Sequence, residues 1–419
     1  MYRYIAYALL GMAFGTTAFG NEVADWNKVM LAATLTAPVT PAPASNRVAA
    51  IVQAAVFDAV NGIDRVYAPI HVESAAPRDA SERAAAVQAA YATLVALYPA
   101  QKGKFDDQRA SSLAAISDSK EAIQHGLDWG QSVADQILAW RAQDGFSNVA
   151  TPYTGGTAPG QWRPTPPAMA SGLLPQLAQT VPFVLTSPSQ FRPNGPPALK
   201  SDQYTADYIE TKSLGSAMGS ARTADQELLA KFWQAGNPPD YWDQLAATLA
   251  QQRGLSLLQT ARVLALVNLA MADSIIGCWD AKYAFSFWRP VTAIRLGDTY
   301  GNDATVADSA WTPLITTPPF PEYPSAHSCA SGAAARILSL EFGEQTTLDV
   351  VSLAMPNVTR RFYSFTAIVD EMKTARIAGG IHFRSACTDG QALGTSVGDY
   401  VLGHAARRSS DRGRRSSQE

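Results

Sequence analysis

The stretch between Lys282 and His382 contains three short motifs, which read Lys282-Tyr-Ala-Phe-Ser-Phe-Trp-Arg289-Pro290, Tyr323-Pro-Ser325-Ala326-His327-Ser328 and Arg376-Ile-Ala-Gly379-Gly380-Ile-His382. Together they supply three cationic side chains, a hydroxyl group next to a helix start, and two imidazoles. Such a set suits a small tetrahedral or trigonal oxyanion, because cations and main-chain N–H groups form strong hydrogen bonds with anionic oxygen. The spacing within each motif has its own physical reason.

The first motif is predicted to lie on a buried helix. Lys282 and Arg289 are seven residues apart, so on a continuous helix both would project from one face, roughly 10 Å apart along the axis. Pro290 disfavours helical geometry at the preceding residue and is expected to end the helix there. The residues between the two cations are mostly apolar and aromatic, which favours a buried site over a solvated basic stripe.

The second motif is expected to open a helix with an anion-binding end. Residues 318–324 contain four prolines and should form an extended approach. Ser325 is a favoured N-cap for a helix over 326–342, whose first N–H groups and positive dipole end would attract an anion. The plainer alternative makes Ser325 only a cap and His327 only a first-turn histidine.

The third motif joins a cation to a histidine across a glycine pair. Arg376 falls in a predicted helix over 366–378, and an unbroken helix would turn His382 about 240° away from it. Gly379-Gly380 can break the helix and return both side chains to one pocket. Because His382 has apolar neighbours, the alternative is a histidine that only packs within the hydrophobic core and has no role in binding.

The combined pattern, Lys-x6-Arg-Pro, then Pro-Ser-x-His, then Arg-x5-His, resembles the type 2 phosphatidic acid phosphatase superfamily. The aromatic first motif and the run Pro-Pro-Phe-Pro-Glu-Tyr-Pro-Ser look like those of the vanadium-dependent haloperoxidases within it. The resemblance is close over 220–400 and looser over 45–215, where Pro159-Gly-Gln-Trp162-Arg163-Pro and Phe191-Arg-Pro193 look like bacterial members. It implies an all-α fold of helical bundles with long irregular loops.

The resemblance also implies residue roles around vanadate. His382 stands at the position of the vanadium ligand, and His327 at that of the acid–base group for the apical oxygen. The oxygens would be held by Lys282, Arg289, Ser325, the Ala326 N–H and Arg376. Hydrogen peroxide, a halide and a small organic substrate would be the reactants, with Lys282 polarising bound peroxide and hypohalous acid as the product. Trp279 and Phe320 match an aromatic pair on the halide side, although both could be ordinary core residues.

Three departures from the family pattern leave alternatives open. Ala326 replaces a glycine but keeps its N–H, and Ala386 stands where an acid often follows the ligand histidine, with Asp389 the nearest carboxylate. Gly236 and Asn237 stand where some chloroperoxidases carry an acid that pairs with the third-motif arginine. An acid phosphatase with His382 as covalent nucleophile and His327 as leaving-group acid shares every site residue, and an inactive helical scaffold is the third reading.

The rest of the chain predicts its organisation. Residues 1–20 read as a signal peptide, so we expect a secreted or periplasmic protein, with an uncleaved anchor as the alternative. A helical region with a Pro/Gly-rich crossover over 21–200 and a catalytic bundle over 201–406 would follow, and then a disordered basic tail over 407–419. The crossover would be an ordered wrap that roofs the site, or a plain connection. The hydrophobic content of 47% indicates a globular chain, and the net charge of −3 gives no indication of nucleic-acid partners. We expect no membrane span in the mature protein, and the oligomeric state is left open.

No alternating strands are predicted, and the expected helices cover 45–60, 80–98, 101–116, 118–142, 203–214, 223–234, 242–254, 256–282, 326–342, 345–354, 366–378 and 389–406. Cys278, Cys329 and Cys387 are an odd number and lack metal-site spacing, so we expect buried free thiols, although a Cys329–Cys387 bridge is sterically conceivable. His71 and His125 are interpreted as structural.

Overall fold

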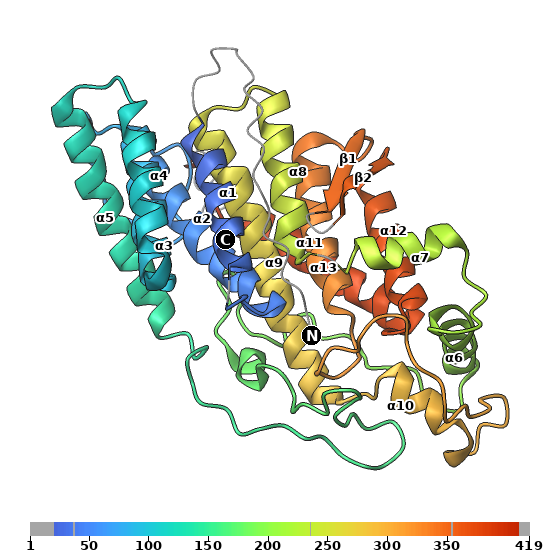
Figure 1. Ribbon diagram of the computed structural model, residues 1–419. Helices are drawn as coiled ribbons and strands as arrows, with labels where there is room; N and C mark the ends of the chain where they lie inside the picture. Colours follow the sequence, from blue (N-terminus) through green and yellow to red (C-terminus); the bar gives the residue numbers. More distant parts are fainter. Residues whose placement is uncertain (1–20, 37, 235, 353–354, 410–419) are drawn as a thin grey trace, which may run out of the picture.

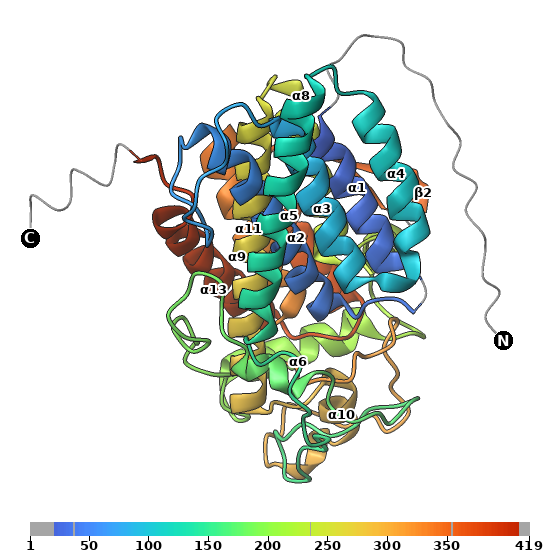
Figure 2. The same cartoon turned by 90° about the vertical axis from the view of Figure 1, so that its left-hand side faces the viewer.

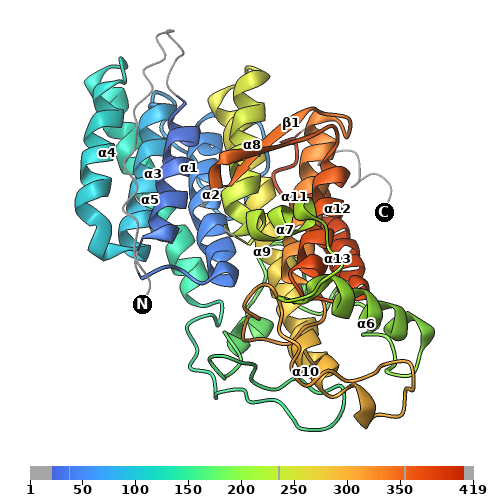
Figure 3. The same ribbon diagram turned by 45° about the vertical axis from the view of Figure 1, so that its right-hand side comes forward.

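The computed structural model describes residues 21–36, 38–234, 236–352 and 355–409, so the predicted signal peptide lies outside the described residues. The regular secondary structure of the described chain is almost entirely helical, as predicted, and the helices stand side by side in two groups (Figures 1 and 3). The first group comprises α1 (Glu22–Leu35), α2 (Ala42–Asp64), α3 (Glu82–Leu97), the 3₁₀ turn η1 (Pro99–Gln101), α4 (Lys102–Ala114) and α5 (Lys120–Ala142).

The second group follows a long crossover that contains the 3₁₀ turn η2 (Pro175–Gln179). Serine and threonine side chains cap the starts of α6, α7 and α9, which explains where these helices begin. Its elements are α6 (Asp202–Gly215), α7 (Ala224–Phe232), α8 (Pro238–Gln252), α9 (Leu257–Phe285), α10 (Pro290–Arg295), the 3₁₀ turn η3 (Gly297–Thr299), α11 (Ala326–Phe342), strands β1 (Leu348–Ser352) and β2 (Met355–Phe362), α12 (Phe365–Ala378) and α13 (Arg384–His404).

The central element is α9, a helix of 29 residues. It packs against α2 of the first group and against α11 and α13 of the second, so one hydrophobic core is continuous across both groups. By length and composition alone α9 could cross a membrane, but 94% of its most apolar window is buried inside the protein. Its apolar character is therefore accounted for by its place in the core.

Within the segment expected to form a helix over 345–354, Leu348–Ser352 instead form strand β1, so that prediction was wrong. Strand β1 pairs antiparallel with β2, and buried and exposed residues alternate along it. Leu348 and Val350 face the core while Asp349 and Val351 face outward. Alternating burial and the β-branched valines are typical of a half-buried strand. In a segment of only five residues, this pattern favours a strand over a helix.

The end of α9 also differs from the prediction. The helix ends at Phe285, and Ser286 adopts a left-handed conformation with φ of 47°. Arg289 then becomes the N-cap of α10, and Pro290 begins that helix rather than ending the previous one. Proline is well suited to a first helical turn, where its missing N–H would have no partner. Lys282 and Arg289 are therefore on different elements, and loop geometry rather than one helix face brings them together.

The crossover between the two groups is fixed to α9, as expected for an ordered wrap. Asp273 of α9 is fully buried and accepts the N–H groups of Phe183, Val184 and Leu185, at 2.6, 2.8 and 2.9 Å. Farther along the same wrap, Leu173 accepts hydrogen bonds from Trp279 and Tyr283 of α9. The long connections collect at one end of the helical bundles, beside α6 and α10 (Figure 2).

Asp273→Ala should destabilise the protein strongly, because three buried N–H groups would lose their acceptor. We expect a loss of about 3 kcal/mol in the free energy of unfolding, since each unsatisfied buried group costs about 1–3 kcal/mol before rearrangement. Denaturant titration measures it, with Asp280→Ala on the same helix as the control. Asp280 pairs with the partly exposed Arg192, and such pairs contribute up to about 1 kcal/mol. Equal losses in the two variants would contradict the anchoring role.

Burial raises the pKa of Asp273 to about 6, although the three N–H groups oppose that rise. The folded chain therefore binds this proton more tightly than the unfolded chain does. The wild type should gain stability relative to Asp273→Asn as the pH falls from about 7 toward 4, through the folded and then the unfolded pKa.

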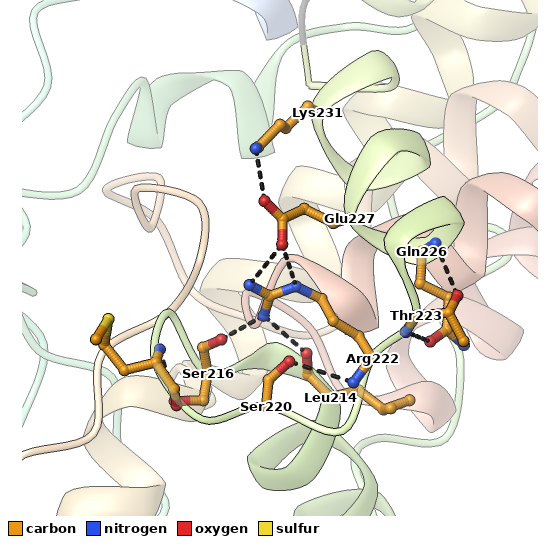
Figure 4. Close-up of polar contacts among 9 residues, drawn as sticks. Leu214, Ser216, Ser220, Arg222, Thr223, Gln226, Glu227 and Lys231 are labelled. Atoms are coloured by element: carbon orange, nitrogen blue, oxygen red, sulfur yellow. Dashed lines mark hydrogen bonds and ion pairs between the residues drawn. The ribbon is translucent and has the colours of Figure 1, made fainter.

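The corner between α6 and α7 is held by Arg222 (Figure 4). Its guanidinium donates to the carbonyls of Leu214 and Ser216 at the end of α6, and to Glu227 of α7, which also pairs with Lys231. This network fixes the direction of α7, and α7 leads directly to Gln234.

The basic tail begins with ordered residues. The Arg407 carbonyl accepts the Ala68 N–H, and the Ser409 N–H donates to Val66, so 407–409 run beside the loop after α2. This differs from the prediction that disorder begins at 407. The remainder of the tail, residues 410–419, lies outside the described residues.

Candidate anion site

The site lies where α9 ends and α11 begins, beside the loop between α12 and α13. His382 is in that loop, two residues before α13, which begins earlier than predicted. The Arg289 Nη1 atom lies 3.3 Å from the His382 Nε2 atom. The first and third motifs thus meet, although 93 residues separate these two side chains in the chain.

His382 is held by a buried carboxylate, Glu322. Its Nδ1 atom lies 2.9 Å from the Glu322 Oε1 atom, which also accepts the Phe383 N–H at 2.9 Å. With Nδ1 donating to Oε1, which also accepts the Phe383 N–H, the Nε2 atom carries the ring's lone pair and faces the Arg289 Nη1 donor at 3.3 Å. Burial, together with the charges of Arg289, Lys282 and Arg376, lowers the pKa of His382 well below its usual value and keeps the ring neutral.

Two arginines place unpaired donors in this region. Arg289 donates from Nε to the Phe320 carbonyl and from Nη1 to that of Ile381, both at 2.8 Å, and its Nη2 atom has no partner among the described residues. Arg376 donates from Nη1 to the Gln234 Oε1 atom at 3.0 Å, and its Nε and Nη2 atoms have no partner within the described chain. Burial lowers the pKa of each arginine to about 10, so both are still cationic at neutral pH.

Lys282 has a different geometry from the one predicted. Its Nζ atom donates to the carbonyls of Pro321, Glu322 and Pro324, which uses all three ammonium donors. Burial lowers the pKa of Lys282 to about 8. Lys282 therefore contributes its charge and holds the proline-rich approach in place, while its N–H bonds are directed at the backbone.

The start of α11 is arranged as the second motif predicts. Ser325 has N-cap geometry, but its Oγ atom makes no capping bond and is buried without a partner in the described chain. The Nε2 atom of His327 is buried and unpartnered in the same way. Burial and the charges of Arg376, Lys282 and Arg289 lower the pKa of His327 well below its usual value. Cys278, Cys329 and Cys387 are buried free thiols.

These unpaired groups fit an oxyanion. Donor atoms of Arg289, Arg376 and Ser325 and the Nε2 atom of His327 are buried without partners in the described chain, and buried polar groups of native proteins normally have one. The buried cations Arg289 and Lys282 lie near Glu322, and burial raises the pKa of Glu322 to about 8, so this acid does not fully balance their charge at neutral pH. Only an anion would supply both the missing acceptors and the missing negative charge.

A cavity of about 230 Å³ lies beside the anion site. Its walls include Trp279, Phe320, Ala326 and His327, as well as Leu173 of the crossover. The rings of Trp279 and Phe320 are 5.0 Å apart, and the Lys282 Nζ atom lies 5.1 Å from the Phe320 ring centre. The aromatic pair thus lies next to Lys282 in the cavity wall, Ala326 and His327 border both the cavity and the anion site, and Leu173 of the crossover contributes to the wall.

Comparison with known proteins agrees with this geometry. Residues 262–411 match the family described as the VCPO second helical-bundle domain. Vanadium chloroperoxidase from Curvularia inaequalis is 30% identical over 176 residues, which cover 34% of this chain and 28% of that protein. A solved bacterial vanadium-dependent iodoperoxidase matches with a TM-score of 0.81 and 26% identity, over 93% of this chain and 98% of that one. The chain is thus similar in sequence and in fold to vanadium-dependent haloperoxidases.

A holo-type bacterial vanadium-dependent chloroperoxidase has the same fold, with a TM-score of 0.70 and 18% identity, over 87% of this chain and 91% of that one. The all-α haloperoxidase fold predicted from the motifs is thereby confirmed, with the β1–β2 hairpin as its one strand element in the described residues.

Two partners of the haloperoxidase motifs were missed by sequence reasoning. Glu322 binds His382, whereas Asp389, the acid considered from the sequence, accepts a hydrogen bond from the Tyr323 hydroxyl. Gln234, rather than an acid near Gly236 and Asn237, accepts from Arg376. A charged residue inside a buried proline-rich run was the available signal for Glu322. No comparable signal marks Gln234.

Arg289→Ala and Arg376→Ala should each weaken the binding of vanadate and of phosphate, because the two anions share charge and shape. Loss of a charge-assisted hydrogen bond should cost about 1.5–3 kcal/mol, which is roughly 10- to 150-fold in Kd. Calorimetric titration with each anion measures this. Arg384→Ala is the matched control, since Arg384 pairs with the surface residue Glu210. A loss confined to one of the two anions would count against a shared site.

Proposed function

We propose that this protein is a vanadate-dependent haloperoxidase, which uses hydrogen peroxide to oxidise a halide to hypohalous acid. One observation carries the proposal most directly. Buried donors of Arg289, Arg376 and Ser325 and the Nε2 atom of His327 lack partners within the described chain, and the Nε2 lone pair of His382 faces the Arg289 guanidinium beside them. The matched segment spans only 28% of the Curvularia chloroperoxidase, so the activity rests on this site rather than on that match.

Vanadate fits these residues in charge and in donor chemistry. His382 would bond to vanadium through Nε2, because Glu322 occupies its other ring nitrogen. Arg289, Arg376, Ser325 and the Ala326 N–H would hold the oxygens. When bound, vanadate supplies a Lewis-acidic centre at which peroxide is activated for attack by halide.

The protein's own groups then have distinct tasks. The neutral His327 ring can accept a proton from an incoming peroxide and later return it. Lys282 supplies fixed positive charge behind Phe320, in a region that excludes water, where the charge is felt strongly. Trp279 and Phe320 provide an apolar wall on which a halide can shed its hydration shell.

Vanadate reconstitution tests the proposal. Protein freed of bound anions should gain bromide- or iodide-oxidising activity when vanadate is added, and phosphate should compete with vanadate for the site. Hydrolysis of a phosphate monoester without halide activity would instead support the acid phosphatase reading. Vanadate binding without either activity would support an inactive scaffold.

Trp279→Ala and Phe320→Ala should lower halide turnover while vanadate still binds. The expected decrease is about tenfold or more, because each change admits water next to Lys282 and weakens its field. Steady-state rates of halide oxidation at saturating vanadate measure this decrease. Phe191→Ala is the control, because Phe191 forms an aromatic pair with Tyr400 elsewhere in the protein. Unaltered halide kinetics in both variants would make the pair ordinary core residues.

We also propose that the protein is exported and that residues 1–20 are removed. The apolar run with a small-residue cleavage site supports this. Mass analysis of the protein recovered from the periplasm or medium should show a chain that lacks this segment. Recovery of the intact chain in the membrane fraction would indicate an uncleaved anchor.

A further inference from the structure

A second cavity, of about 730 Å³, lies at the start of α9, whereas the anion site lies at its end. Its lining comes from the end of α8, the start of α9, the end of α11 and the segment after α13. We call it the arginine pocket, because four arginines and one acid give its lining an excess of three positive charges. These charged residues are Arg253, Arg262, Arg407, Arg408 and Glu341.

Arg262 is the fixed cation of the arginine pocket. Its Nε atom donates to the Ala406 carbonyl at 3.0 Å, and its Nη1 atom donates to the Glu341 Oε1 atom at 2.8 Å. The guanidinium also lies over the ring of Tyr67, 5.0 Å from the ring centre. Arg262 is therefore held from three sides, and Glu341 is neutralised by this pairing.

The other three guanidinium groups have no counter-ion among the described residues of the lining, because its acid is already paired with Arg262. Arg253 is the exposed C-cap residue of α8. The main chain of Arg407 and Arg408 is fixed beside Tyr67 and Ala68, through the Ala68 N–H at 2.7 Å and a β-bridge to Tyr67. Cations from separate parts of the chain thus surround one hollow, although like charges repel one another.

We propose that the arginine pocket binds an anion with several phosphate groups, such as a short chain of inorganic polyphosphate. A guanidinium presents a planar fork of donors that matches two oxygens of a phosphate. A single orthophosphate has fewer oxygens than three unpaired forks can hold, whereas linked phosphate groups can reach arginines on different elements. The volume of about 730 Å³ agrees with a ligand of this size.

This binding is independent of the proposed function. Arg262 and Lys282 are twenty residues apart on α9, which places them about 30 Å apart along the helix axis. At that separation the two sites share no ligand, so either proposal can fail without the other.

Calorimetric titration of the full chain with inorganic tripolyphosphate tests the proposal. Arg253→Gln and Arg408→Gln should each raise Kd about three- to tenfold, the effect of losing a charge-assisted contact that is partly exposed. Arg336→Gln is the matched control, because it removes the same charge from a surface pair with Asp399. Arg289→Ala, which disables the anion site, should leave the affinity for tripolyphosphate unchanged.

Glu341→Gln provides the sharper test, because it should improve binding. The variant removes the only acid of the described lining and frees Arg262, which keeps its contacts with Ala406 and Tyr67. Kd for tripolyphosphate should fall about three- to tenfold. Asp399→Asn, which removes an acid outside the pocket, should leave Kd near that of the wild type.

Three results would overturn the proposal. Equal losses in Arg253→Gln and Arg336→Gln would mean that tripolyphosphate responds only to the overall charge of the surface. A loss of binding in Arg289→Ala would place the ligand in the anion site. Unchanged or weaker binding in Glu341→Gln would show that this acid does not oppose an anion and that the arginines are only surface charges.

Discussion

His382→Ala should abolish halide oxidation while leaving the helical fold intact. His382 is the only histidine of the described site whose ring is held by Glu322, and no other histidine there could take over the proposed bond to vanadium with the same orientation. We expect activity to fall at least about 10³-fold, as when a catalytic nucleophile is removed. Halide turnover at saturating vanadate measures this, and far-ultraviolet circular dichroism checks the fold.

The control for this variant is His404→Ala. His404 is exposed at the end of α13 and stacks on Tyr400, so its loss should leave turnover near that of the wild type. If His382→Ala retains a substantial vanadate-dependent rate, His382 is not the ligand, and Glu322 would then serve only to stabilise the loop before α13.

The motif residues could be predicted because charged groups and glycine pairs are rare inside apolar runs. Arg376 and His382 flank Gly379-Gly380, and the structure does bring the third motif to the first. The path of the chain between Lys282 and Arg289 could not be predicted in the same way. Ser286 adopts a left-handed conformation that serine seldom takes, so nothing local indicated that α9 would stop before Pro290.

Partners supplied by tertiary contacts were beyond sequence reasoning. Glu322 reaches His382 across 60 positions in sequence, and Gln234 reaches Arg376 across 142. The share of the N-terminal group in the cavity beside the anion site was equally hidden, because Asn46 of its lining belongs to a helix predicted from apolar spacing alone. Local pattern thus identifies groups that carry charge, whereas the groups that orient them depend on how helices pack.

His327→Ala should separate catalysis from vanadate binding. His327 lies in the first turn of α11 and borders the cavity through which peroxide would arrive, with a buried Nε2 atom that has no partner in the described chain. Loss of a general acid–base group lowers rates by about 10²–10⁴-fold. Vanadate affinity should change little, because the arginines, Ser325 and His382 would still hold the anion. Titration with vanadate and turnover at saturating vanadate measure the two effects separately.

The pH dependence gives a second measure of the same role. Burial, together with the charges of Arg376, Lys282 and Arg289, keeps the pKa of His327 well below its usual value, so the ring is neutral at pH 7 and can act as a base. An anion in the site opposes those cations and raises this pKa toward the ordinary range. The rate constant kcat/KM for peroxide should therefore fall as the pH drops through that value in the wild type. His327→Ala should lose this acidic limb, and His327→Gln, which can donate a hydrogen bond but cannot carry the proton, should lose it too. Collapse of vanadate binding in either variant, or an acidic limb that persists in both, would mean that His327 anchors the anion instead of moving its proton.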